Sequence, residues 1–138
     1  MAASKARTEA AYAVVVGTCD TKREDLAFVR DLLVAAKVPV KLVDVGTQSK
    51  DKSADVTAAQ VAASHPKGAS AVTKQSDRGQ AVAAMSEAFE AWVEKHKGEI
   101  AGMIGLGGSG NTALVTPGMR RLPIGVPKIM VSTVASGN

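Results

Sequence analysis

The chain has 138 residues, of which 46% are hydrophobic and 22% are charged, and its formal net charge is +4. This length supports one domain with a sizeable core, and the single cysteine excludes an intramolecular disulfide or a cysteine metal cluster. The positive charges are spread along the chain without an aromatic-studded basic stripe, which argues against a nucleic-acid partner.

The start of the chain and the length of its apolar runs indicate the cellular location of the protein. Residues 1–10 lack the apolar core of a signal peptide, and no apolar run approaches membrane-spanning length. We expect a disordered leader at residues 1–10, one nucleotide-binding α/β domain at residues 11–138, and a cytoplasmic protein without membrane contact. Aromatic residues are only 3% of the chain, so the core must be aliphatic, which suits parallel strands under helices.

Two apolar runs near the N-terminus predict the first two strands. Residues 11–16, ended by Gly17, predict a strand buried on both faces. Apolar side chains at helical spacing then predict a helix over residues 22–37. Residues 40–46 predict the second strand, which contains Asp44 near its end. Doubly wound folds commonly place at this position the carboxylate that binds a ribose hydroxyl, although a solvated carboxylate is equally consistent with it.

The loop after the first strand has two interpretations of similar weight. Thr21 and Glu24 have the spacing of a capping box, which predicts only a well-formed helix start. The alternative is a site for a phosphate or its metal ion, because small and polar residues follow a buried strand here. The residues of that alternative site are Gly17, Thr18, Asp20 and Lys22.

Two helices are expected between the second and third strands. A short helix covers residues 53–63, capped by its first residue, and residues 67–76 are expected to form a loop. A long amphipathic helix follows over residues 77–98, with Asp77 as its N-cap. Arg78 lies in its first turn, where a cation opposes the helix dipole unless it meets an anion. We therefore predict that Arg78 binds phosphate.

The glycine-rich segment at residues 105–112 follows an apolar run, predicted as the third strand, and precedes a helix start. Such a joint places backbone N–H groups at the positive end of a helix dipole, which suits a phosphate. It is not a dinucleotide fingerprint, because no acid follows Glu99, and not a Walker A loop, because Asn111 replaces the lysine. A glycine-rich turn without a ligand is the alternative. The residues predicted to bind phosphate are Gly107, Gly108, Ser109, Gly110, Asn111 and Thr112.

The rest of the chain completes a parallel sheet. A short helix closed by residues 116–118 leads to a fourth strand at residues 128–131 and then to a hydroxyl-rich loop. We expect four parallel strands in the order 2-1-3-4 with helices on both faces, a three-layer doubly wound (Rossmann-like) α/β fold. Because the carboxyl ends of parallel strands share one edge, the last loop and the glycine loop should line a single cleft. The residues expected in that cleft are Gly108, Ser109, Ser132 and Thr133.

Five segments of the chain match known proteins: residues 17–22, 77–79, 107–112, 122–128 and 131–137. Together they resemble the family of the tomato mosaic virus resistance protein, which is otherwise largely uncharacterised. The resemblance runs from residue 12 to the end and implies an amino-terminal ATP-binding domain. The family loop usually reads Gly-Gly-Ser-Gly-Gly-Thr, and Asn111 takes the place of its last glycine. Asparagine tolerates a left-handed backbone, so we expect the geometry of the loop to survive this replacement. Family members continue into a second, barrel-like domain, so this chain is expected to be truncated at its C-terminus.

The resulting hypothesis is an ATP-binding module, with magnesium as a companion of the nucleotide. The glycine loop and Arg78 would hold the phosphates, and Asp44 the ribose. Because the loop lacks the Walker lysine, a cation must come from elsewhere, and Arg78 and Lys128 are the nearest candidates by topology. One alternative is a phosphoryl-transfer or ATP-dependent enzyme that needs a second domain. Others are a nicotinamide oxidoreductase, disfavoured because the first strand lacks the glycine fingerprint, and a module that binds a partner protein or forms a homodimer.

Overall fold

The fold is known from a computed structural model, which describes residues 11–133. The predicted leader at residues 1–10 and the end of the final loop lie outside these residues. Four strands form one parallel sheet in the order β2-β1-β3-β4, as predicted. The strands are β1 (Tyr12–Gly17), β2 (Val40–Asp44), β3 (Ile100–Gly107) and β4 (Lys128–Ser132).

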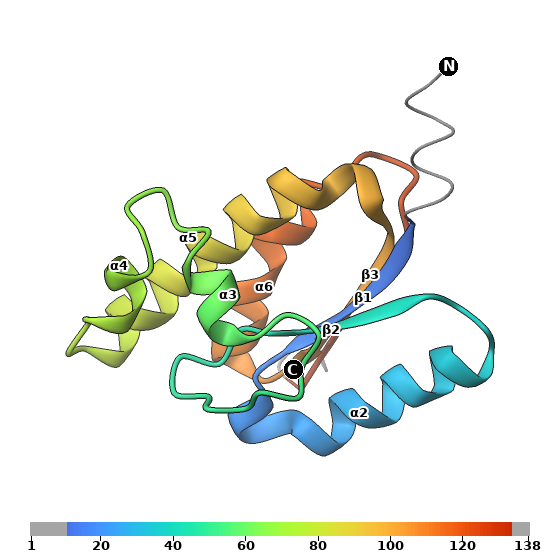
Figure 1. Cartoon of the computed structure of the whole chain (residues 1–138), viewed down its shortest axis with the longest axis horizontal. Coiled ribbons are helices and arrows are strands. Elements are labelled where there is room, and N and C mark those ends of the chain that lie inside the picture. Colours follow the sequence, from blue (N-terminus) through green and yellow to red (C-terminus); the bar gives the residue numbers. More distant parts are fainter. Residues whose placement is uncertain (1–10, 134–138) are drawn as a thin grey trace.

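Helices cover both faces of this sheet, which confirms the three-layer doubly wound architecture. One face carries α2 (Cys19–Ala35) alone, and the other carries the remaining helices (Figure 1). No helix within residues 11–133 has the length and apolar character needed to cross a bilayer. The helices of the second face are α3 (Ala58–Ala62), α4 (Ser70–Thr73), α5 (Arg78–His96) and α6 (Ser109–Met119), with a 3₁₀ turn, η1 (Lys97–Glu99), after α5.

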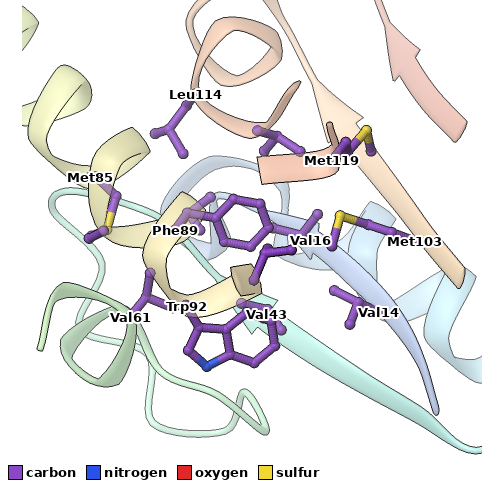
Figure 2. Packing of buried hydrophobic residues seen from close by; sticks show 14 of the residues in the cluster. Val14, Val16, Val43, Val61, Met85, Phe89, Trp92, Met103, Leu114 and Met119 are labelled. Carbon is purple, nitrogen blue, oxygen red and sulfur yellow. The ribbon is translucent and has the colours of Figure 1, made fainter. Parts of the chain in front are cut away.

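The central strand β1 is covered on both of its faces. Val14 and Val16 belong to the larger core under α5 and α6, whereas Val15 belongs to the smaller core under α2. All three side chains are fully buried, which explains why this strand is apolar without alternation. In the larger core the rings of Phe89 and Trp92 stack with their centroids 6.1 Å apart (Figure 2). Most of the few aromatic residues of the chain therefore lie on this side of the sheet.

The start of α2 differs from the prediction. The helix begins at Cys19, about one turn before the predicted start, and its N-cap Thr18 makes no side-chain cap bond. Lys22 has non-helical backbone angles (φ −128°, ψ 23°), so the helix is kinked there. The predicted capping box of Thr21 and Glu24 is therefore wrong, because Thr21 lies inside the helix and its hydroxyl lies 2.6 Å from that of Thr18.

The segment between β2 and α5 also differs from the prediction. α3 is capped by Thr57 and not by Ser53, because Thr57 and Gln60 form a reciprocal capping box: Thr57 N donates to Gln60 Oε1 (2.8 Å) and Gln60 N to Thr57 Oγ1 (3.3 Å). Ser53 instead donates to Asp51 Oδ1 through both its amide and its hydroxyl. The loop expected over residues 67–76 contains the short helix α4.

The last helix continues past the point at which we expected it to close. Pro117 lies inside α6, and the helix ends only at Met119. Leu114 and Met119 are buried in the larger core, and Ser86 Oγ of α5 donates to the Leu114 carbonyl (2.9 Å). Packing against α5 therefore holds the final turn in a helical conformation although proline removes one backbone donor.

Candidate functional site

The cavity of greatest interest opens at the carboxyl ends of β1 and β3, where the chain leaves for helices on opposite faces of the sheet. Ligands of doubly wound proteins bind at such a switch point. The cavity has a volume of about 320 Å³. It is lined by Thr18, Asp20, Thr21, Lys22, Val45, Thr47, Arg78, Val82, Gly108, Ser109, Gly110, Asn111 and Leu114.

Much of the predicted site is therefore brought together. The N-terminal ends of α2, α5 and α6 all reach this cavity, and each contributes the positive end of a helix dipole. Sequence reasoning did not select Thr47 or Val45, although both follow β2 and lie at the same edge of the sheet. The rule that parallel strands end at one edge would have indicated them.

The N-terminus of α6 presents backbone donors to the cavity. Its N-cap is Gly108, which has no side chain to cap the helix. The first helical bond runs from Thr112 N to Gly108 O (3.0 Å), so the N–H groups of residues 109–111 have no acceptor within the helix. By contrast, Asp77 caps α5 by accepting from Gln80 N (2.9 Å), as predicted.

Two cations lie at the same cavity. Arg78, the first residue of α5, is exposed and makes no ion pair with another residue in the described range 11–133. Lys22 lies at the kink of α2, and its Nζ is 3.9 Å from the Asp25 carboxylate. Among the described residues that line the cavity, Asp20 is the single carboxylate. The lining is therefore electropositive and suits an anion.

Asn111 lies in a helical stretch and does not use the left-handed backbone that asparagine tolerates. Its Nδ2 donates to the Leu106 carbonyl across the glycine turn. A Cβ on Gly107 would overlap the Asn111 side chain, which explains the glycine at position 107 by close approach. The residue is 8% exposed, and its Oδ1 is buried without a hydrogen-bond partner among the described residues. This oxygen is therefore a buried acceptor that the described part of the chain leaves unpaired.

Asp44 does not line the cavity, which corrects its expected place beside a ribose. It is fully buried, and its Oδ1 accepts from Cys19 N (3.0 Å) and Gly46 N (2.8 Å). Its Oδ2 accepts from Ser49 Oγ (2.5 Å). Asp44 therefore holds the first turn of α2 against the turn after β2. Gly17 also serves the fold, because a Cβ there would lie 2.8 Å from the Leu26 side chain.

The four residues predicted to share a cleft come from segments that touch each other, but they are divided between two cavities. Thr133 N donates to Gly107 O (3.2 Å), and Thr112 Oγ1 lies 2.6 Å from Ser132 Oγ. However, Ser132 and Thr133 line a second cavity of about 340 Å³ between α2 and β4, and neither residue lines the first. The single cleft expected from Gly108, Ser109, Ser132 and Thr133 is therefore wrong.

Lys128 is also not where its predicted role would require it. It is the first residue of β4, so it lies at the amino-terminal edge of the sheet, opposite to the carboxyl ends where the cavity opens. Its Nζ donates to the carbonyls of Pro123 (2.9 Å) and Val126 (2.8 Å) in the preceding connection. Lys22 lies at the cavity in its stead.

Cys19 and His65 are buried side chains whose contacts belong to the fold. Burial, followed by the charge of Asp44, raises the pKa of Cys19 to about 12, so this thiol is a poor nucleophile. His65 is buried, with Nε2 2.8 Å from Glu87 Oε2 and Nδ1 accepting from Lys67 N. No group of three or more His, Cys, Asp or Glu residues suited to a metal ion occurs within residues 11–133.

Comparison with known proteins supplies a family. Residues 11–138 match the uncharacterised protein family UPF0261, N-terminal domain. The chain is 52% identical over 124 residues to the UPF0261 protein mlr3387 of Mesorhizobium japonicum, covering 90% of this chain and 31% of that protein. It is 41% identical over 140 residues to the ToMV susceptible protein tm-1(GCR26) of Solanum lycopersicum, covering 88% and 19%. It is 39% identical over 140 residues to the ToMV resistance protein Tm-1(GCR237) of the same plant, with the same coverage. The chain thus spans about a third or less of the length of these relatives.

Proposed function

The chain belongs to the UPF0261 family through its N-terminal domain, and from that premise we propose that it is an ATP-binding module of a larger two-domain protein. One observation carries the proposal: the uncapped N-terminus of α6 opens into a cavity that also contains Arg78 and Lys22. The resemblance of its motifs to an ATP-binding domain supplies the identity of the anion.

The phosphates would be bound at the N-terminus of α6. The N–H groups of residues 109–111 donate to phosphate oxygens, and the glycines at the turn let the ligand approach the backbone. Arg78 from α5 and Lys22 from α2 supply the positive charge that a Walker lysine would otherwise provide. The cations therefore come from two elements far from the glycine turn in sequence.

Magnesium fits the donor set of this cavity if it arrives with the nucleotide. Mg²⁺ is usually held by one or two carboxylates together with phosphate oxygens and water. Asp20 lines the cavity and is exposed, so its carboxylate can contribute one ligand. The ion would then neutralise phosphate charge beside the N-terminus of α6.

The location and assembly of the protein follow as proposals of their own. The one cysteine is buried and unpaired, which is compatible with the reducing cytoplasm.

A partner protein or a homodimer is a second candidate role, because α2 and β4 expose large apolar side chains. These are Phe28, Leu32, Val34, Ile129 and Val131, each more than half exposed.

The proposal is tested by titrating ATP with magnesium into the protein in a calorimeter. Arg78→Ala should weaken ATP binding about tenfold or more, because a charge-assisted hydrogen bond contributes about 1.5–3 kcal/mol. Arg120→Ala is the matched control, since it removes the same charge at the far end of α6 and should leave the affinity unchanged. Absence of heat and of thermal stabilisation at millimolar ATP would reject the proposal.

A further inference from the structure

The second cavity, named here the α2–β4 groove, adjoins the cavity at the N-terminus of α6, named here the phosphate cavity. Lys22 lines both, and the glycine turn separates them, with Gly107 in the groove and Gly108 in the phosphate cavity. Its volume is about 340 Å³. It is lined by Lys22, Asp25, Phe28, Val29, Leu106, Gly107, Val131, Ser132 and Thr133.

The groove has an aromatic and aliphatic wall. Phe28 is 66% exposed and Val131 is 51% exposed, whereas Leu106 at the end of β3 is buried. The chain has only two phenylalanines, and the other, Phe89, is fully buried in the larger core. The exposed ring of Phe28 beside the phosphate cavity is therefore not explained by packing in the core.

The location of the groove follows from the fold. α2 packs on β1, β2 and β3, and it leaves Ile129 and Val131 of the edge strand β4 more than half exposed. The kink at Lys22 lies where α2 passes from the phosphate cavity to the groove. A ligand with an anionic part and a flat apolar part could therefore contact both cavities beside one lysine.

We propose that the α2–β4 groove holds the base of the nucleotide whose phosphates lie at the N-terminus of α6, an inference that rests on the proposed function. The base stacks on Phe28 and contacts Val131 at its edge. Asp25, whose side chain is 67% exposed, lies at the groove as a hydrogen-bond acceptor. It can accept a hydrogen bond from an N–H group of the base, which adenine and guanine both offer.

The test compares ATP with inorganic tripolyphosphate, which carries the phosphates without a base. In the unaltered protein ATP should bind more tightly than tripolyphosphate. Phe28→Ala should weaken ATP binding about tenfold, the loss expected when one base–aromatic contact is removed, and should leave tripolyphosphate binding unchanged. Leu32→Ala is the matched control: this side chain lies one helical turn away on α2, is 55% exposed and does not line the groove, so neither affinity should change.

Three results would overturn the inference. If ATP and tripolyphosphate bind equally and Phe28→Ala changes neither, the phosphate site stands and the base lies elsewhere. If neither ligand binds the unaltered protein, the proposed function fails and this inference fails with it. If sedimentation shows a dimer that Phe28→Ala dissociates while ATP affinity per subunit is unchanged, the groove is covered by a second copy of the chain.

Discussion

At the scale of single residues, Asp44 explains the surroundings of the lone cysteine. The carboxylate accepts from the backbone N–H of Cys19, and its negative charge opposes ionisation of the nearby thiol. Burial is the larger cause, and together they raise the pKa of Cys19 to about 12. A thiol with this pKa stays protonated under ordinary conditions, so Cys19 contributes to the core and not to catalysis.

The raised pKa of Cys19 predicts a loss of stability at high pH. Between the pKa of a free thiol, about 8.5, and about 12, the unfolded chain releases a proton that the folded protein keeps. The free energy of unfolding should therefore be unaffected by this group below about pH 8.5 and fall above it by about 1.4 kcal/mol per pH unit. Urea unfolding at pH 8 to 10 checks this.

Cys19→Ala is the control for that measurement, because it should flatten the decline. Tyr12 acts in the same direction at higher pH, since burial and the charge of Glu99 raise its pKa to about 12 as well. The contribution of Tyr12 begins near pH 10, the pKa of a free tyrosine, and is the same in both proteins, so it cancels in the comparison. Equal slopes for the two proteins would contradict the assignment to Cys19.

At the scale of elements, the pairing of α5 with α6 depends on close approach. Gly118 of α6 lies against the Phe89 ring of α5, and a Cβ there would lie 2.6 Å from two ring carbons. Phe89 is fully buried and stacked on Trp92, so the ring has little room to move. This contact accompanies the continuation of α6 through Pro117, which the local sequence argued against.

Gly118→Ala should therefore destabilise the protein by about 1–3 kcal/mol, the usual cost of overpacking a core. Gly110→Ala is the matched control in the same helix, since a Cβ there meets no atom within 4 Å. That change should be neutral or slightly stabilising, because alanine favours helix more than glycine does. Chemical denaturation of both variants measures the difference, and equal stability would show that α5 and α6 separate readily.

At the scale of the whole molecule, ligand binding at the meeting point of three helices should stabilise the folded state. ATP at about a hundred times its Kd should add about 2.7 kcal/mol to the free energy of unfolding. Gly108→Val should abolish this gain by blocking the backbone. The fold should tolerate the change, because Gly108 has extended backbone angles and, among residues 11–133, a Cβ would meet only Thr133 Oγ1, at 3.6 Å.

Denaturant unfolding with and without ATP measures both quantities in one experiment. Tripolyphosphate in place of ATP separates a general anion effect from nucleotide binding. If Gly108→Val keeps the full stabilisation by ATP, the glycine segment is a turn without a ligand. In that case the N-terminus of α6 does not bind the phosphates.

The sequence by itself determined the class of fold and the edge of the sheet at which the candidate cavity lies. Apolar runs that end in glycines or acids identify buried parallel strands, and the handedness of their connections then yields the order β2-β1-β3-β4. The position of Arg78 in the first turn of a helix was also predicted from the sequence, and the residue lines the cavity. These features depend on local periodicity and on rules that hold for any parallel sheet.

Only the tertiary structure decided which side chains meet. Asp44 occupies the expected end of β2, yet its oxygens are taken by Cys19, Gly46 and Ser49. Ser132 and Thr133 lie beside the glycine turn but line the cavity on its other side. Spacing along a chain specifies where a residue lies on its own strand or helix. The direction of its side chain depends on packing against elements distant in sequence, which no local pattern encodes.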